Sequence, residues 1–272
     1  MKRRRNLLVI ALSAAASLAL VACASSPSSS DETAGAGGQN VPAAGSGNVP
    51  NGGNDDNGAC SELVLPADQN DVIATFEDGL GSVNQDAPGR GGGFYAFNDG
   101  TGTQTPPANS ATAPTATSIS HCESTYALCT NGSGFSTWGA GIGTDIGKID
   151  AATGKKTPYD ATQYKGVAFW AKSNAGETAV KVKFPDKNTA EEGGVCDSSV
   201  PDGPTACYND WSKTVNLTEE WQAVTITFSE LQQETWGAIY DAFDITTLYA
   251  LQFQVGPNIA FDFCIDDLIF VR

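Results

Sequence analysis

Short runs of β-branched and aromatic residues make up most of the second half of the chain, and this pattern limits the folds that it can adopt. Clusters of Gly, Pro, Asn and Asp bound the runs, as is typical of antiparallel strands. We predict strands at residues 72–76, 93–98, 134–140, 164–172, 178–184, 221–228, 248–255 and 261–272. Many short strands with long loops indicate an all-β fold, an antiparallel β-sandwich or jelly roll of two packed sheets.

Alternation within the runs supports this prediction. In residues 178–184 the valines and the phenylalanine share one face while the two lysines take the other, which is typical of a strand with one buried face. Only residues 229–238, SELQQETWGA, predict a helix, with Ser229 as its N-cap.

The N-terminus predicts export. A basic start is followed by the apolar run Leu7–Val21, which is too short to span a bilayer comfortably, so we predict a signal peptide at residues 1–22. The sequence LVAC at residues 20–23 resembles the lipobox of bacterial lipoproteins, which implies cleavage before Cys23 and acylation of that cysteine. An ordinary secretory signal with an incidental Cys23 is the alternative. Since Ala24 follows the cysteine, lipoprotein sorting suggests a lipid-anchored protein at the outer membrane or cell surface.

Residues 23–59, which begin with the acylated cysteine, are rich in Ser, Gly and Asn with almost nothing large and apolar. Such a segment cannot bury enough surface to offset its chain entropy, so we predict a disordered tether. Residues 60–272 remain for one globular domain.

The charge of the chain excludes some partners. Its formal net charge is −16, and loss of the four basic residues at positions 2–5 with the signal peptide lowers it to −20. A protein this acidic repels phosphate backbones and anionic lipid surfaces. We therefore expect no nucleic-acid partner, membrane contact through the N-terminal lipid only, and a monomer.

The cysteines predict disulfides. Six remain after Cys23: Cys60, Cys122, Cys129, Cys196, Cys207 and Cys264. An even number in an exported chain indicates disulfides, but the sequence leaves many connectivities open. Proximity favours Cys122–Cys129 and Cys196–Cys207, which leaves Cys60–Cys264. A metal-thiolate site is the alternative, although the chain lacks a CxxC pair in this region.

A set of motifs in a fixed order adds a family resemblance. The motifs are VIATFEDG (72–79), YKGVAFWAKS (164–173), WQAVTITFSEL (221–231), LQFQV (251–255) and FCIDDLIF (263–270). Together they resemble the galactose-binding-like β-sandwich of bacterial carbohydrate-binding modules of the family 4, 11 and 22 type. The resemblance covers the whole predicted domain and implies a module that binds polysaccharide.

The resemblance also implies a structural Ca²⁺ between the first and last strands. Glu77 and Asp266 would be side-chain ligands, with Asp78 or nearby loop carbonyls completing the shell, and oxygen is the ligand that Ca²⁺ prefers. Strict alternation instead directs Asp267 toward the core. Either a bulge shifts the register near Asp266, or Asp267 is the buried partner, or both carboxylates are solvated.

Glycan binding in such modules needs aromatic rings beside amides and carboxylates. The first candidate set for this chain is Trp170, Gln252 and Gln254, which we expect to share one sheet face, and Tyr95 and Trp138 are the next candidates. The alternative for Trp170 is a second apolar layer under a loop.

Catalytic motifs are not supported. The glycine-rich segments lack the context of a nucleotide-binding loop, no nucleophile elbow is present, and the only histidine, His121, lies beside a predicted disulfide. We predict a non-catalytic, membrane-tethered polysaccharide-binding lipoprotein at the bacterial cell surface. The alternative is a structural or protein-interaction sandwich without a glycan site.

Overall fold

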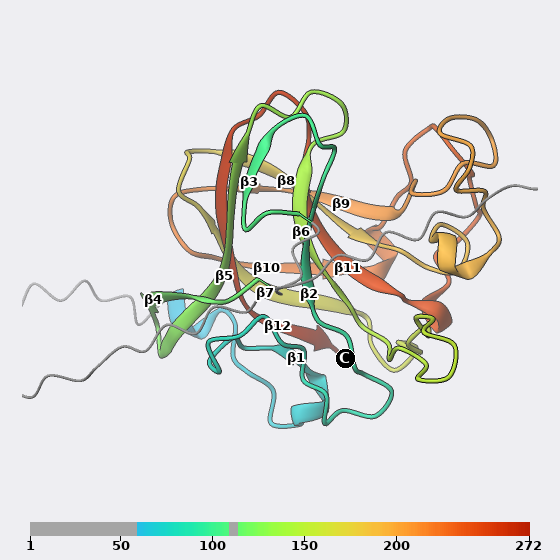
Figure 1. Ribbon diagram of the computed structural model, residues 1–272. Coiled ribbons are helices and arrows are strands. Elements are labelled where there is room, and N and C mark those ends of the chain that lie inside the picture. The colour runs from blue at the N-terminus through green and yellow to red at the C-terminus, as the bar shows by residue number, and fades with distance from the viewer. Residues whose placement is uncertain (1–58, 109–113) are drawn as a thin grey trace, which may run out of the picture. The chain divides into compact units, whose positions relative to one another are not determined.

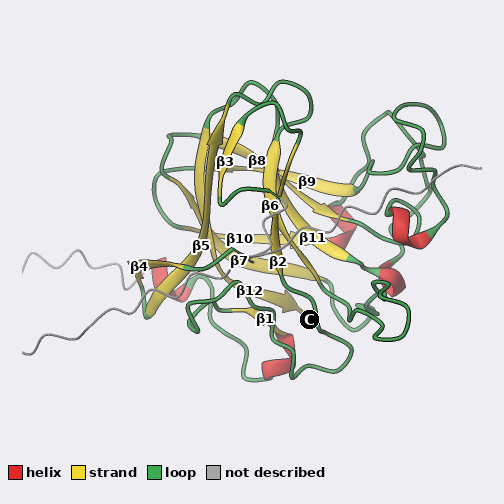
Figure 2. Cartoon of the chain, viewed as in Figure 1, coloured by secondary structure: helices red, strands yellow, loops and turns green. Residues whose placement is uncertain are grey.

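The computed structural model describes residues 59–108 and 114–272, which form an all-β domain (Figure 1). The predicted signal peptide, Cys23 and almost all of the predicted tether lie outside these residues. The helices of the described part are 3-10 turns of three residues each, drawn red in Figure 2. None of its helices is long and apolar enough to cross a membrane.

The strands form two antiparallel sheets. The seven-stranded sheet has the order β10 (Gln222–Thr227), β7 (Gly166–Ser173), β12 (Phe261–Val271), β5 (Ser124–Ser133) and β3 (Thr103–Thr105), with β1 (Val72–Ala74) beside β12 and β4 (Thr117–His121) beside β5. The five-stranded sheet has the order β2 (Phe94–Asn98), β6 (Ala140–Asp145), β11 (Ala250–Val255), β8 (Thr178–Phe184) and β9 (Trp211–Leu217). The predicted all-β sandwich is confirmed.

The main core lies between the two sheets. Phe169 of β7 meets Phe253 of β11 edge to face, with ring centroids 5.1 Å apart. The alternation predicted for β8 is confirmed, since its valines and phenylalanine are buried in the core and its lysines lie on the other face. Each large apolar side chain buried this way contributes roughly 1.5–3 kcal/mol.

Two local predictions are wrong. The helix predicted at residues 229–238 is absent: Phe228–Glu230 is a single 3-10 turn, and the next segment pairs with β9 through reciprocal backbone hydrogen bonds between Ser212 and Gln232. Pairing with a strand edge here overrides helix propensity. The strand predicted at residues 134–140 starts only at Ala140, and the residues before it form a loop.

The six cysteines form three disulfides: Cys60–Cys122, Cys129–Cys264 and Cys196–Cys207. The predicted Cys196–Cys207 pair is confirmed, whereas the predicted Cys122–Cys129 and Cys60–Cys264 pairs are wrong. The reason is that Cys129 lies within β5, directly opposite Cys264 of β12. Cys122 lies in the turn before β5, and the extended strand carries Cys129 too far from it to form a disulfide.

Candidate functional site

The outer face of the five-stranded sheet has no side chains along the middle of β6, because two outward positions of that strand, Gly141 and Gly143, are glycines. Gly143 lies between Tyr95 of β2 and Gln252 of β11, and Gly141 lies in the same way between Phe97 and Gln254. A Cβ atom on Gly143 would lie only 3.1 Å from the Tyr95 ring. The aromatic rings of β2 therefore occupy the room that side chains on β6 would need.

These rings form a row that continues onto a loop. The Phe97 ring centroid lies 6.1 Å from that of Tyr95 and 6.1 Å from that of Trp138, and the Phe97 and Trp138 rings are stacked with an interplanar angle of 23°. Trp138 is 43% exposed. We call Tyr95, Phe97 and Trp138 the aromatic row.

The two glutamines of β11 lie beside the aromatic row. Gln252 Nε2 donates to the Tyr95 hydroxyl at 3.0 Å, and Gln254 Nε2 donates to the backbone carbonyl of Trp138 at 2.7 Å. The structure thus brings together four of the predicted binding residues. An amide carries acceptor as well as donor groups, so both glutamines retain capacity to bond a ligand hydroxyl.

Trp170 does not join this set, and the prediction that it shares a face with Gln252 and Gln254 is wrong. It lies on β7 of the other sheet, is only 2% exposed, and packs edge-on against His121 with ring centroids 4.7 Å apart. Trp170 belongs to the second apolar layer named as its alternative. Alternation gave the face of each strand, but not the sheet to which each strand belongs.

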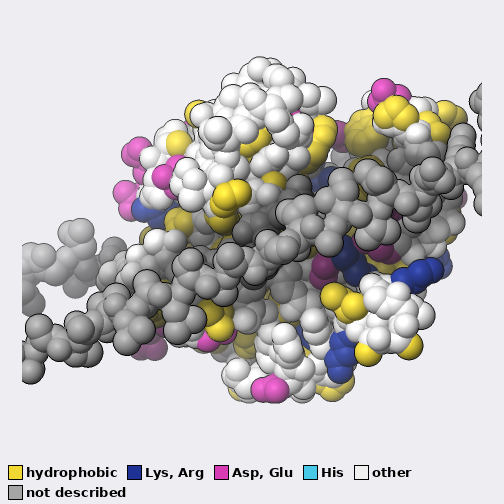
Figure 3. Space-filling model, viewed as in Figure 1, with side chains coloured by type: hydrophobic (Ala, Val, Ile, Leu, Met, Phe, Trp, Pro, Cys, Tyr) yellow, Lys and Arg dark blue, Asp and Glu magenta, His cyan; other side chains and the backbone are white. Residues whose placement is uncertain are grey.

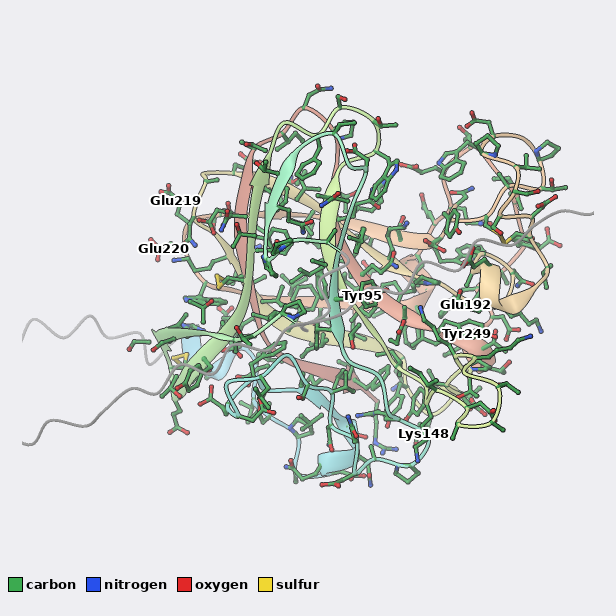
Figure 4. All side chains as sticks on the ribbon, in the orientation of Figure 1. Tyr95, Lys148, Glu192, Glu219, Glu220 and Tyr249 are labelled. Atoms are coloured by element: carbon green, nitrogen blue, oxygen red, sulfur yellow. A yellow bond between two sulfur atoms is a disulfide. The ribbon has the colours of Figure 1, made fainter. Side chains whose placement is uncertain are left out.

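A cavity of about 640 Å³ opens beside Tyr95. Its lining includes Tyr95, Gln252, Tyr249, Glu192, Tyr208 and Asp210. Figure 4 shows Tyr95 near the middle of the view with Glu192 and Tyr249 to its right, whereas Glu219 and Glu220 of the β9–β10 turn lie at the left. The volume lies within the range of roughly 300–1,000 Å³ that is usual for ligand sites.

Charged side chains line one end of the cavity. Lys156 Nζ lies 3.0 Å from Asp145 Oδ1, 2.9 Å from Glu192 Oε1 and 5.7 Å from the centre of the Tyr95 ring. Burial raises the pKa of Tyr95, and the charge of Asp145 adds to this effect. Burial alone would lower the pKa of Lys156, but the neighbouring carboxylates outweigh it and raise that pKa.

A second candidate site lies at the bulge in β12. The register with β7 shifts between Asp266 and Ile269, and Asp267 has a positive φ of 46°. The predicted bulge alternative is confirmed, and Asp266 is the fully buried aspartate. Its Oδ1 accepts the Asp267 N–H at 2.8 Å, while its buried Oδ2 has no hydrogen-bond partner.

The electrostatics of this carboxylate cluster, Glu77, Asp266 and Asp267, are unfavourable to three negative charges. Burial raises the pKa of Asp266 to about 7, because burial and the charges of Asp267 and Glu77 outweigh the opposing interactions with the Ser124 hydroxyl and the Asp267 N–H. Burial and the charge of Glu77 raise the pKa of Asp267 to about 6. A buried carboxylate with an orphaned oxygen fits a cation beside it.

The oxygen atoms of the cluster are not arranged as a coordination shell. Both Glu77 oxygens accept hydrogen bonds from Thr125, and Asp78 Oδ1 accepts from the N–H of Leu80. In the part of the chain that the structure describes, no three His, Cys, Asp or Glu side chains form a group that could hold a metal ion. The charge of the cluster fits Ca²⁺, but its geometry would have to adjust to bind one.

Comparison with known proteins identifies the family. A family model described as "Carbohydrate binding domain 30" matches residues 90–272. The chain belongs to this family. Residues 90–272 are therefore a carbohydrate-binding domain of family 30. This range contains every strand of the two sheets except β1.

Solved structures similar to this family 30 domain are distant in sequence. A family 11 carbohydrate-binding module from Clostridium thermocellum, in complex with a beta-1,3-1,4-mixed-linked tetrasaccharide, is 14% identical, with 66% of this chain and 88% of that chain covered and a TM-score of 0.40. A crystal structure of a family 30 carbohydrate-binding module is 16% identical, with 65% and 82% covered and a TM-score of 0.42. No curated protein sequence matches the chain.

Sequence reasoning missed several residues of the candidate site, among them Phe97 of the aromatic row and Tyr208 of the cavity lining. Phe97 could have been found, because residues i and i+2 of a strand share a face and Tyr95 was already a candidate. Tyr208 lies in a loop outside the strands, and no periodic pattern marks it.

Proposed function

We propose that this protein is a non-catalytic, membrane-tethered lipoprotein that binds polysaccharide at the bacterial cell surface through the outer face of its five-stranded sheet. The observation that carries the proposal is the aromatic row, with Gln252 and Gln254 beside it. The C–H face of a sugar ring packs on aromatic planes, and its hydroxyls exchange hydrogen bonds with amides.

Affinity electrophoresis through soluble polysaccharides and pull-down with insoluble ones test this proposal. The panel includes neutral and acidic glycans. We expect retention on at least one, and Trp138→Ala to weaken binding by on the order of 2 kcal/mol, about thirtyfold. Trp236→Ala is the matched control, since Trp236 is also exposed but lies outside the aromatic row. Lack of retention on every glycan would overturn the proposal.

The tether is a separate part of the proposal. An acylated Cys23 would hold the domain at the outer membrane or cell surface, because each buried CH₂ of an acyl chain contributes ~0.8 kcal/mol. Cell fractionation tests this: the wild-type protein is expected with the membranes and Cys23→Ser in the soluble fraction. A wild-type protein that fractionates as soluble would contradict lipid anchoring.

A bound Ca²⁺ is also proposed, with Glu77, Asp266 and Asp267 as ligands and Asp78 or loop carbonyls completing the shell. The orphaned Oδ2 of Asp266 and the raised pKa values of both aspartates support it. The ion would add positive charge beside these carboxylates, and so stabilise the closing strand β12.

The second candidate function is a protein-interaction sandwich without a glycan site. Several apolar side chains are exposed on the loops after β8 and β10, among them Val195, Trp236 and Ile239. Figure 3 shows hydrophobic side chains gathered at the upper right, where Figure 1 draws these loops in orange. Failure of the whole glycan panel would favour this function.

A further inference from the structure

Tyr208 stands at the rim of the cavity in a backbone conformation that tyrosine rarely adopts. Its φ is +73°, in the left-handed region, and its side chain is 48% exposed. A non-glycine residue in this region costs on the order of 1 kcal/mol or more and persists only where the surrounding structure holds it. Such residues cluster at ligand-binding sites.

Contacts on both sides of Tyr208 hold it in this conformation. The preceding residue, Cys207, is tied to Cys196, and the Tyr208 N–H donates to the Thr189 carbonyl at 2.9 Å. The following residue, Asn209, is buried and donates to the backbone carbonyl of Glu234 at 2.8 Å. The backbone around Tyr208 is therefore fixed before any ligand arrives.

The ring of Tyr208 is fixed at its far end and open on its faces. Its hydroxyl donates to Glu191 Oε2 at 2.7 Å, a contact that with burial raises the pKa of Tyr208 to about 12. In the described part of the chain no aromatic ring stacks on it, whereas Tyr95 has Phe97 and Lys156 against its ring. An exposed ring that is already ordered can bind a ligand with little further loss of entropy.

Hydrogen-bond acceptors lie in the same cavity wall. Asp210 is buried and paired with Lys183 at 2.7 Å, but its Oδ1 has no partner. That oxygen is enclosed by the protein, whereas the carboxylate of Glu192 is exposed and can accept a charge-assisted hydrogen bond from a ligand hydroxyl. Asp210 and Glu192 both line the cavity with Tyr208.

We propose that Tyr208 is a further glycan-binding residue, a second aromatic platform at the cavity wall that works together with the aromatic row. This inference rests on the proposed function. It assigns the ligand as an oligosaccharide stretch long enough to lie on the aromatic row and reach the cavity, where Glu192 accepts a sugar hydroxyl. A short oligosaccharide that covers only the aromatic row would not contact Tyr208.

Calorimetric titration of the full mature chain with oligosaccharides of increasing length tests this inference, using fragments of a polysaccharide that retains the protein. The key variant is Tyr208→Asn, because Asn removes the ring and tolerates a positive φ. We expect this variant to lower the affinity for the longest oligosaccharide roughly tenfold. Its affinity for the shortest oligosaccharide that binds should be unchanged. Tyr208→Phe keeps the ring and is expected to stay within about threefold of wild type.

Two controls separate binding from folding. Val195→Ala changes an exposed apolar residue of the same loop that does not line the cavity, and is expected to bind as wild type. Melting temperatures of all variants identify any that fail to fold.

The outcomes distinguish the two proposals. If wild type binds no glycan, the proposed function fails. If wild type binds and Trp138→Ala weakens it, but Tyr208→Asn binds every length as wild type does, this inference alone is overturned. Equal weakening at every length would also overturn it, because Tyr208 would then act on the aromatic row rather than at a separate place.

Discussion

The carboxylate of Asp99 accepts a hydrogen bond from the backbone N–H of Trp138 at 3.0 Å. The same oxygen accepts from the N–H groups of Thr137 at 2.9 Å and Gly139 at 3.0 Å, and the other oxygen accepts from Thr101. Burial alone would raise the pKa of Asp99, but these hydrogen bonds outweigh it and hold that pKa well below its usual range. One carboxylate thus fixes the loop that carries the most exposed ring of the aromatic row.

Asp99→Asn is expected to weaken glycan binding roughly tenfold, because the amide NH₂ must face the N–H of Thr101 or those of the Trp138 loop, and the remaining neutral oxygen holds the loop less strongly. The measurements are binding to the retained polysaccharide and tryptophan fluorescence, which should shift toward longer wavelength as Trp138 becomes more solvated. Asp150→Asn is the control: Asp150 anchors another exposed loop through the N–H groups of Ala152 and Thr153. Equal binding by both variants would contradict this role for Asp99.

The two disulfides at Cys129–Cys264 and Cys196–Cys207 are expected to differ in their effect on stability. They close loops with sequence separations of 135 and 11 residues. Chain entropy predicts contributions of about 5 and about 3 kcal/mol, respectively. Replacing each pair by serines should therefore lower the denaturant midpoint more for Cys129–Cys264. A larger loss for Cys196–Cys207 would contradict this ranking.

Local patterns predicted the two-sheet architecture well, because alternation and β propensity act within single strands. β8 has the boundaries that the sequence indicated, and the buried positions of β12 change face at the bulge that was one of the alternatives. β5 was missed, since STYALCTNGS is too polar to read as a core strand. The disulfide errors followed from this omission.

The candidate site was only partly predictable, because its composition depends on which strands pair. Tyr95, Gln252 and Trp138 were identified as residue types that suit glycans. Two other features depend on long-range strand pairing. One is the position of the β6 glycines beside the rings, and the other is the position of Trp170 on the other sheet. Asp99 and Tyr208 lie near or in loops, where no periodicity shows the direction of a side chain.

The carboxylate cluster predicts a pH dependence of stability. The pKa of Asp266 is about 7 and that of Asp267 about 6, against about 3.9 in an unfolded chain. Between these values the two folded-state carboxyls hold more protons than their unfolded counterparts, so their contribution to the free energy of unfolding falls as pH rises from about 4 to about 7. In chelator, the melting temperature should decrease across this range, and Asp266→Asn should make the decrease smaller. An identical pH profile for this variant would contradict the raised pKa of Asp266.

Added Ca²⁺ should reverse this loss at pH 8. A ligand that binds only the folded state raises its melting temperature, and the ion supplies the positive charge that the ionised carboxylates lack. Melting curves of wild type and Asp266→Asn, each in chelator and in excess Ca²⁺, give the comparison. The wild-type melting temperature should rise and that of the variant should rise less. A wild-type protein that Ca²⁺ does not stabilise would contradict the proposed ion.

The two outward glycines of β6 provide a final prediction, because they are matched in position and differ in what a side chain would meet. A Cβ atom on Gly143 would lie 2.9 Å from Cγ of Gln252 and 3.1 Å from the Tyr95 ring, which are side-chain atoms that can move, and 3.1 Å from the backbone carbonyl oxygen of Leu251. A Cβ atom on Gly141 would lie 2.9 Å from the Phe97 ring but only 2.0 Å from the backbone carbonyl oxygen of Phe253, which is fixed in the sheet.

Gly143→Ala should therefore displace the binding residues while the fold adjusts, whereas Gly141→Ala should strain the sheet itself. We expect Gly143→Ala to weaken glycan binding severalfold with a small change in melting temperature, and Gly141→Ala to lose roughly 1–3 kcal/mol of unfolding free energy. Denaturant unfolding and glycan titration on both variants separate the two effects. If Gly143→Ala binds as wild type does, the positions of Tyr95 and Gln252 do not matter for the ligand. Of the aromatic row, only Phe97 and Trp138 would then remain as proposed glycan-binding residues.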